Sequence, residues 1–289
     1  MSEIRVVTDS TALFIDPSII SRYNITVVPV YVRFGDDRFK LGIDIGPEEF
    51  LHRMRYNHVI PRLEPPTPDE CRTVYARLNR EVSKIVSIHI SANLTGVYRN
   101  MLAASKMLLG RCDIAVIDSQ TLSVGLGILA EKAAILARQI SDLEEVVRAV
   151  RRAIGRVYSV FFVQTMTTIC HHNLISEAQA ILGSMLGVMP FITIEEGNLV
   201  IMEKALDSSQ AVDKLVEFAG EFTDFEQLVI LHHTPLLTNT IRQLQDRLAL
   251  ELSTSNFPTH LYDGSLATFL GSDAAGIVIM ENEDEDEYL

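Results

Sequence analysis

The stretch that decides the fold is IVSIHISANLTGVYRNMLAASKMLLGRCDIAVIDSQT, residues 85–121. It begins and ends with short runs rich in β-branched residues, 85–90 and 114–117, which favour strands. The longer segment between them is predicted to be helical. A strand, a helix and a second strand in this order are typical of a βαβ unit, in which the two strands pair in parallel.

The same alternation extends toward the N-terminus. Residues 4–7 and 25–32 are predicted to be further strands. A helix is expected to begin at Pro47, because proline suits the first helical position and two acidic residues follow it. Thr67 and Glu70 have the spacing of a capping box at the start of another helix. Residues 1–155 are therefore predicted to form an N-terminal α/β domain with a mainly parallel sheet and flanking helices.

The pattern changes near residue 155. Residues 157–163 predict a strand, 175–186 an amphipathic helix, and 191–194 with 199–202 a hairpin around Gly197. A helix over 209–221, a strand over 228–231 and a helix over 239–252 are expected to follow. We interpret residues 156–280 as a C-terminal mixed α/β domain with antiparallel strands, and residues 281–289 as an acidic disordered tail.

Composition excludes several classes of function. The 289 residues are 47% apolar and carry a net charge of −13, with no basic stripe for binding nucleic acid. No apolar run is long enough to span a membrane, and the first residues do not resemble a signal peptide, so a cytoplasmic location is predicted. Cys71, Cys112 and Cys170 are widely spaced, which predicts buried free thiols rather than disulfides or a zinc site.

Small polar residues follow three of the predicted strands, in residues 8–11, 91–96 and 118–121. The carboxyl ends of parallel strands are where ligands bind in open sheets, and free amides at helix starts attract anions. The alternative is that these residues only cap helices and form turns. Both interpretations remain open from the sequence.

Signatures of catalysis are scarce, and no cofactor or metal is predicted. Gly125 and Gly127 partly fit a dinucleotide fingerprint but begin too far after their strand, which favours helix packing. The neighbouring histidines 171–172 and 232–233 cannot chelate a metal alone, because adjacent side chains point different ways. An enzyme would have to use scattered acids and bases. The candidates are Asp9, Glu64, Asp118 and His232.

The motifs, taken in order, resemble those of the bacterial DegV family. The resemblance spans about residues 4–280, and its most specific part in the second half is 175–186 with 190–193. The other matching segments are VTDST (7–11), VVPV (27–30), GIDIGPEEF (42–50), ISANLTGVY (90–98), VIDS (116–119) and GLG (125–127). A DegV-like, two-domain α/β fold is what this resemblance implies.

The resemblance also implies a function. Family members hold one fatty acid between the two domains, so the chain is expected to be a lipid-binding protein and not an enzyme. Its expected partner is a long-chain fatty acid or related lipid, with the acyl chain in an apolar interdomain tunnel. Some members are the acyl-carrying subunit of a bacterial fatty acid kinase, which makes the catalytic subunit of that kinase a second candidate partner.

Positions expected near the lipid head group depart from the family pattern. Leu63 and Glu64 replace a threonine and a serine, and Ala92 replaces a serine. Leu174 replaces an arginine, and Phe269 a histidine. Binding of a non-carboxylate lipid, without a kinase role, is therefore an alternative. The predicted head-group site comprises Asp9, Ser10, Leu63, Glu64, Ser91, Ala92, Asn93, Thr95, Gly96 and Phe269.

Overall fold

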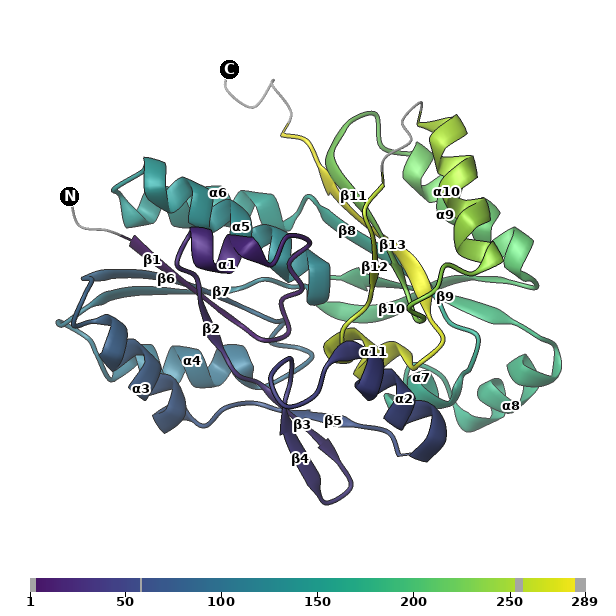
Figure 1. Cartoon of the computed structure of the whole chain (residues 1–289), viewed down its shortest axis with the longest axis horizontal. Coiled ribbons are helices and arrows are strands. Elements are labelled where there is room, and N and C mark those ends of the chain that lie inside the picture. The colour runs from purple at the N-terminus through teal and green to yellow at the C-terminus, as the bar shows by residue number, and fades with distance from the viewer. Residues whose placement is uncertain (1–3, 58, 253–256, 284–289) are drawn as a thin grey trace.

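A computed structural model describes residues 4–57, 59–252 and 257–283. Its first sheet has the strand order β2-β1-β6-β7, and all neighbouring strands are parallel, as predicted (Figure 1). Because the strands are parallel and adjacent, the polar loops that follow β1, β6 and β7 meet at one edge. The strands are β1 (Ile4–Asp9), β2 (Thr26–Val28), β6 (Lys84–His89) and β7 (Asp113–Asp118).

Helices cover both faces of this sheet (Figure 1). The predicted capping box starts α3: Thr67 Oγ1 accepts from the Glu70 amide, and Glu70 Oε2 accepts from the Thr67 amide at 2.7 Å. Pro47 begins α2, also as predicted. The helices of this half are α1 (Ser18–Arg22), α2 (Pro47–Asn57), α3 (Pro68–Leu78), α4 (Val97–Lys106), α5 (Ser123–Gln139) and α6 (Leu143–Ile154).

The second sheet has the order β10-β9-β8-β13-β11-β12 and is antiparallel except for the β11–β12 pair. The predicted hairpin is present, and its two-residue loop has positive φ at both Glu196 and Gly197, as type I′ turns require. The strands are β8 (Val157–Phe162), β9 (Met189–Glu195), β10 (Asn198–Ala205), β11 (Phe225–His232), β12 (Thr259–Leu261) and β13 (Ala275–Glu281). Two helices, α9 (Ser208–Gly220) and α10 (Asn239–Glu251), pack together on its outer face.

A small third sheet corrects one prediction. The single strand expected over residues 25–32 is divided, because Pro29 lacks the amide hydrogen that a continuing ladder needs and Ser10 Oγ accepts from the Val30 amide at 2.9 Å. The chain leaves the first sheet there and enters β3, which pairs with two antiparallel neighbours. The strands of this sheet are β3 (Tyr31–Phe34), β4 (Asp37–Lys40) and β5 (Arg62–Glu64).

One apolar core joins the two halves. It extends from Val6 in β1 to Val278 in β13, and α5 contacts strands of both large sheets. A Cβ on Gly127 would lie 2.2 Å from the backbone oxygen of Leu13, so glycine is needed for this close packing of α5. The predicted packing role of the Gly125–Gly127 segment is confirmed.

Three short helices complete the second half: α7 (Thr167–His171), α8 (Glu177–Met185) and α11 (Gly264–Leu270). β13 extends to Glu281, the first residue of the predicted acidic tail, and the Glu283 carboxylate pairs with Arg156. Residues 284–289 of that tail lie outside the described residues. None of the described helices is long and apolar enough to cross a membrane. Cys71 and Cys112 are buried free thiols as expected, whereas Cys170 is only half-buried.

Candidate functional site

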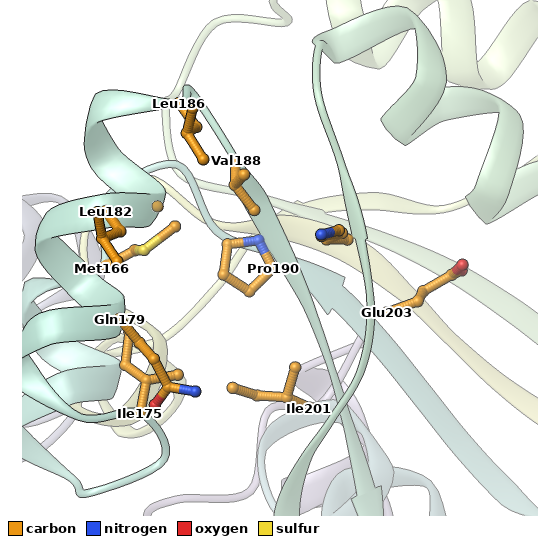
Figure 2. Close-up of a pocket in the computed structure, with 11 residues that line it drawn as sticks. Met166, Ile175, Gln179, Leu182, Leu186, Val188, Pro190, Ile201 and Glu203 are labelled. Carbon is orange, nitrogen blue, oxygen red and sulfur yellow. The ribbon is translucent and has the colours of Figure 1, made fainter.

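An apolar cavity of about 620 Å³ lies between α8 and the β9–β10 hairpin (Figure 2). Its volume is typical of a site for a small molecule. All of its lining residues belong to the predicted C-terminal domain, so its position differs from that of the predicted interdomain tunnel. The lining residues are Met166, Ile175, Gln179, Leu182, Gly183, Leu186, Val188, Pro190, Ile201, Glu203 and Lys204.

One wall of the cavity is α8, which starts at a capping box formed by Ser176 and Gln179. No residue of this helix is buried, although its sequence is largely apolar. Leu182 remains 60% exposed and the adjacent Leu186 remains 71% exposed. Fully burying a leucine side chain releases about 1.5–3 kcal/mol. Because these leucines are largely exposed, most of that free energy would be gained only when something covers them. A ligand in the cavity would cover part of this surface.

The opposite wall consists of side chains of β9 and β10. Successive side chains of a strand point to opposite faces of the sheet, so only alternate residues face the cavity. Pro190 lines the cavity, while Phe191 next to it packs into the core beneath α9 and α10. On β10 the register shifts between Ile201 and Glu203, which marks a β-bulge. Ile201 pairs with Ile192, and Lys204 pairs with Pro190.

Three of the lining residues are polar. Glu203 points away from the cavity in Figure 2, and its carboxylate pairs with Lys214 of α9. Gln179 Oε1 accepts hydrogen bonds from the Ser176 amide and hydroxyl, both at 2.9 Å. Lys204 forms no ion pair with any residue in the described ranges. The electrostatic character of the cavity therefore depends on Lys204 and on the amide of Gln179.

The predicted head-group loop contacts the hairpin rather than this cavity. Ser91 Oγ donates to the Gly197 carbonyl at 2.7 Å, and Asn93 Nδ2 donates to the Glu196 carbonyl at 3.1 Å. A Cβ on Gly197 would lie 2.4 Å from Ser91 Oγ, so only glycine fits there. These contacts attach the first half of the molecule to the tip of the β9–β10 hairpin.

The side chains of the other polar head-group candidates also have hydrogen-bond or ion-pair partners within the protein. Ser10 Oγ accepts from Val30, and Thr95 Oγ1 accepts from the Val97 amide at 3.2 Å. Glu64 accepts from Arg33 at 2.6 Å and from Arg38 at 3.0 Å. The hydrogen bond from Arg33 is the main cause that lowers the pKa of Glu64 below its usual value. The negative charge of Glu64 is thus compensated by two arginines.

The remaining candidates, Leu63, Ala92, Gly96 and Phe269, have no side-chain group that can bind a carboxylate. The ring of Phe269 lies 5.1 Å from that of His172, whose Nε2 is 2.9 Å from the Thr268 carbonyl oxygen. None of the predicted head-group residues lines the α8–hairpin cavity. Their role at a head group stays a prediction.

The three polar loops meet at one edge of the first sheet, where they bond to one another. The Ser91 amide donates to the Thr121 carbonyl at 3.0 Å, and the Ala92 amide to Asp118 Oδ1 at 3.1 Å. The Ile90 amide donates to Asp9 Oδ2 at 3.1 Å. These amides are satisfied within the fold, which favours the turn and capping interpretation over an anion site.

A buried chain of hydrogen bonds was not anticipated from the sequence. Tyr75 Oη donates to Ser87 Oγ at 2.8 Å, and Ser87 Oγ lies 2.7 Å from His89 Nε2. His89 Nδ1 lies 2.9 Å from Asp9 Oδ2. Ser87 and His89 lie two residues apart on β6 and therefore share a face, which is the signal that could have revealed the pair.

This serine, histidine and aspartate have the order of hydrogen bonds found in a hydrolytic triad. All three side chains are completely buried, however, so a substrate has no access to the Ser87 hydroxyl. We interpret the chain as a satisfied polar network inside the first half.

The acids and bases considered for an enzyme are not brought together. Glu64 is in the third sheet with its two arginines, and Asp118 accepts from loop amides. His232 is at the end of β11, where burial lowers its pKa. Among the residues that the structure describes, no cluster of three or more histidines, cysteines and acidic residues could hold a metal ion.

Comparison with solved structures places this fold among known proteins. A fatty acid binding DegV family protein of Streptococcus agalactiae superposes with a TM-score of 0.87 at 20% identity, covering 98% of this chain and all (100%) of that chain. A DegV family protein of Thermus thermophilus, described for its fatty acid binding, gives a TM-score of 0.83 at 23% identity, covering 97% and 100% of the two chains.

Comparison of the sequence with known proteins points to the same family as the structural comparison. A DegV domain-containing protein of Caldanaerobacter subterraneus subsp. tengcongensis is 28% identical over 283 residues, covering 97% of this chain and 100% of that protein. Residues 3–282 match the family model described as "Uncharacterised protein, DegV family". This match covers nearly the whole chain, and the chain therefore belongs to the DegV family.

Proposed function

We propose that this chain is a non-catalytic, cytoplasmic binding protein for a long-chain fatty acid or a similar acyl lipid. The observation that carries the proposal is the apolar cavity of about 620 Å³ under a helix with no buried residue. The acyl chain would lie between the inner side of α8 and the hairpin, in contact with Leu182, Pro190 and Ile201. This position lies within the second half, whereas the tunnel that the family resemblance implies lies between the two halves.

Burial of the acyl chain should contribute more to the free energy of binding than contacts with the head group do. Burying a chain of roughly 14 methylenes releases on the order of 10 kcal/mol before the costs of association. A hydrogen bond to a charged head group adds about 1.5–3 kcal/mol. An apolar cavity can therefore sustain lipid binding even where the head-group contacts of the family are replaced.

The related proteins support this choice of ligand class. The structures from T. thermophilus and S. agalactiae, which share the fold over nearly the whole chain, are described as fatty acid binding.

Presentation of the bound acid to a separate kinase would be a further step. Incubating the loaded protein with such a kinase and ATP tests it, and acyl phosphate is the product to be measured.

The binding proposal is tested by mass spectrometry of an organic extract from the purified, denatured protein. A bound acyl lipid at close to one molecule per chain is expected. Delipidated protein should also take up an added long-chain fatty acid in equilibrium dialysis. An empty extract together with no uptake would refute the proposal.

A further inference from the structure

A second cavity, of about 430 Å³, lies between α2 of the first half and, in the second half, α7 and the loop from α11 to β13 (Figure 1). Met166, just before α7, lines the α8–hairpin cavity, whereas Thr165, Thr167 and Thr168 line the second cavity. Among the described residues, none lines both cavities. The lining of this α2–α7 cavity is completed by residues 54–55, 59–60 and 271–273.

The Thr168 side chain provides an unused polar group in the α2–α7 cavity. Thr168 is only 6% exposed, and its hydroxyl forms no hydrogen bond with any residue that the structure describes. A Cβ on Gly271 would lie 3.1 Å from this hydroxyl, so glycine keeps the space beside it open. Buried polar groups are nearly always hydrogen-bonded, and a bound molecule that supplies the missing partner would gain affinity from it.

The charged groups of the cavity are one cation and one anion. Arg55 donates from Nη2 to the His233 carbonyl at 2.7 Å and to the Ser272 carbonyl at 2.9 Å, which leaves Nη1 without a partner in the described ranges. Asp273 Oδ2 accepts from the Thr165 hydroxyl, and its Oδ1 is buried. Because the two charges have opposite sign, the cavity favours a ligand with no net charge.

The other lining groups suit a ligand that carries several hydroxyls. Thr167 and Ser272 add two hydroxyls that have no hydrogen-bond partner within the described part of the chain. A hydroxyl can both donate and accept, so ligand hydroxyls can accept from Arg55 Nη1 and pair with the hydroxyls of the protein. The carbon atoms of such a ligand would contact the apolar lining residues, which are Met54, Val59 and Ile60.

We propose that the α2–α7 cavity binds a small, uncharged polyol, such as a sugar alcohol, with the Thr168 hydroxyl and Arg55 Nη1 as its main polar contacts. This site is separate from the α8–hairpin cavity in position and in the chemistry of its ligand, and it does not depend on lipid binding. A molecule bound there contacts both halves of the protein at once.

The test compares three ligands with the same hydroxylated six-carbon chain. Wild-type protein is titrated at neutral pH with D-glucitol, which is neutral, with its anionic 6-phosphate, and with the cationic 1-amino-1-deoxy-D-glucitol. Ligand-observed NMR measures the three affinities. D-Glucitol should bind at least about fivefold more tightly than either charged analogue, because burying a charge is unfavourable where the lining has no net charge to compensate it.

The variant Thr168→Val replaces the hydroxyl with a methyl group of similar size and should weaken D-glucitol binding about fivefold. It should unfold at the wild-type temperature, because the lost hydroxyl has no partner among the described residues. Thr73→Val, on the exposed surface of α3, is the matched control and should bind as the wild type does.

Three results would overturn the proposal. Tighter binding of either charged analogue would show that Arg55 or Asp273 dominates the site and that its ligand is charged. Equal affinity of Thr168→Val and the wild type for D-glucitol would place the polyol elsewhere. Binding of none of the three compounds would show that the cavity does not recognise this class of ligand.

Discussion

The hydroxyl of Ser123, at the start of α5, donates a 2.6 Å hydrogen bond to Oδ1 of Asp263, which lies 140 residues later in the sequence. Asp263 also caps α11 by accepting from the Ser265 amide at 2.9 Å. Both Ser123 and Asp263 are buried. One carboxylate therefore joins the N-terminal half to the segment that precedes β13.

This link predicts a pH dependence of stability. Burial is the largest effect on Asp263 and raises its pKa, against the smaller lowering effect of its serine hydrogen bonds. The unfolded chain releases this proton near pH 3.9, whereas the folded protein keeps it to higher pH. The free energy of unfolding should therefore fall as pH rises above about 4, with a limiting slope of about 1.4 kcal/mol per pH unit for this group.

The variant Asp263→Asn should remove this contribution to the slope, since asparagine does not titrate and still caps the helix. Urea denaturation at a series of pH values measures the effect. Asp246→Asn, on the solvent-exposed side of α10, is the control and should retain the wild-type slope. A wild-type slope in Asp263→Asn would mean that Asp263 is ionised throughout this pH range.

The buried network of Tyr75, Ser87, His89 and Asp9 should be structural rather than catalytic. His89→Leu leaves the Asp9 carboxylate and the Ser87 hydroxyl without their shared partner, so the free energy of unfolding should fall by about 3 kcal/mol. His52→Leu, on the exposed surface of α2, should change it by less than about 0.5 kcal/mol.

A fluorophosphonate probe gives an independent measure, because it labels accessible activated serines. The folded wild-type protein should not be labelled at Ser87, which is completely buried. Labelling that disappears in Ser87→Ala would instead revive a hydrolytic function for the Ser87–His89–Asp9 arrangement.

Much of the fold could be predicted from local patterns. The strands on either side of α4 are short β-branched runs, and Gly197 marks the hairpin turn, where only a residue that tolerates positive φ fits. The helix α11 was missed because each of its residues is buried, so no amphipathic periodicity indicates it. The division of residues 25–32 depends on Pro29 and on a long-range contact from Ser10.

The candidate site was harder to predict because it depends on tertiary spacing. The cavity exists only because α8 is held away from β9 and β10, and no sequence pattern encodes that distance. A period of two along β10 would assign Glu203 rather than Lys204 to the cavity face, and only the observed bulge reverses this assignment. The loop containing Ser91 was correctly placed at the sheet edge, but its hydrogen bonds to the hairpin could not be read from the residues.

The contact between Ser91 and Gly197 should be tested by a double-mutant cycle. Gly197→Ala introduces a Cβ at φ +78° and 2.4 Å from Ser91 Oγ, so it should lower the free energy of unfolding by about 2 kcal/mol. In a Ser91→Gly background that clash is absent, and the cost should fall to about 1 kcal/mol because only the backbone strain remains. A cost that is the same in both backgrounds would show that the two residues are not coupled.

A larger side chain inside the apolar cavity should weaken lipid binding. Ile201→Trp would place an indole ring between Pro190 and α8, where the acyl chain is proposed to lie. Affinity for a long-chain fatty acid should fall by more than about tenfold, equivalent to losing the contacts of about two methylenes. The fold should persist, because Ile201 is only half-buried and faces empty space.

Equilibrium dialysis measures the affinity of this variant, and far-ultraviolet circular dichroism checks its fold. Leu250→Trp is a matched control, since Leu250 is 83% exposed on α10, a helix that contributes no lining residue. That variant should bind lipid as the wild type does. Full affinity in Ile201→Trp would show that the acyl chain occupies a different part of the molecule, because a chain of that length and an indole ring cannot share the space between α8 and the hairpin.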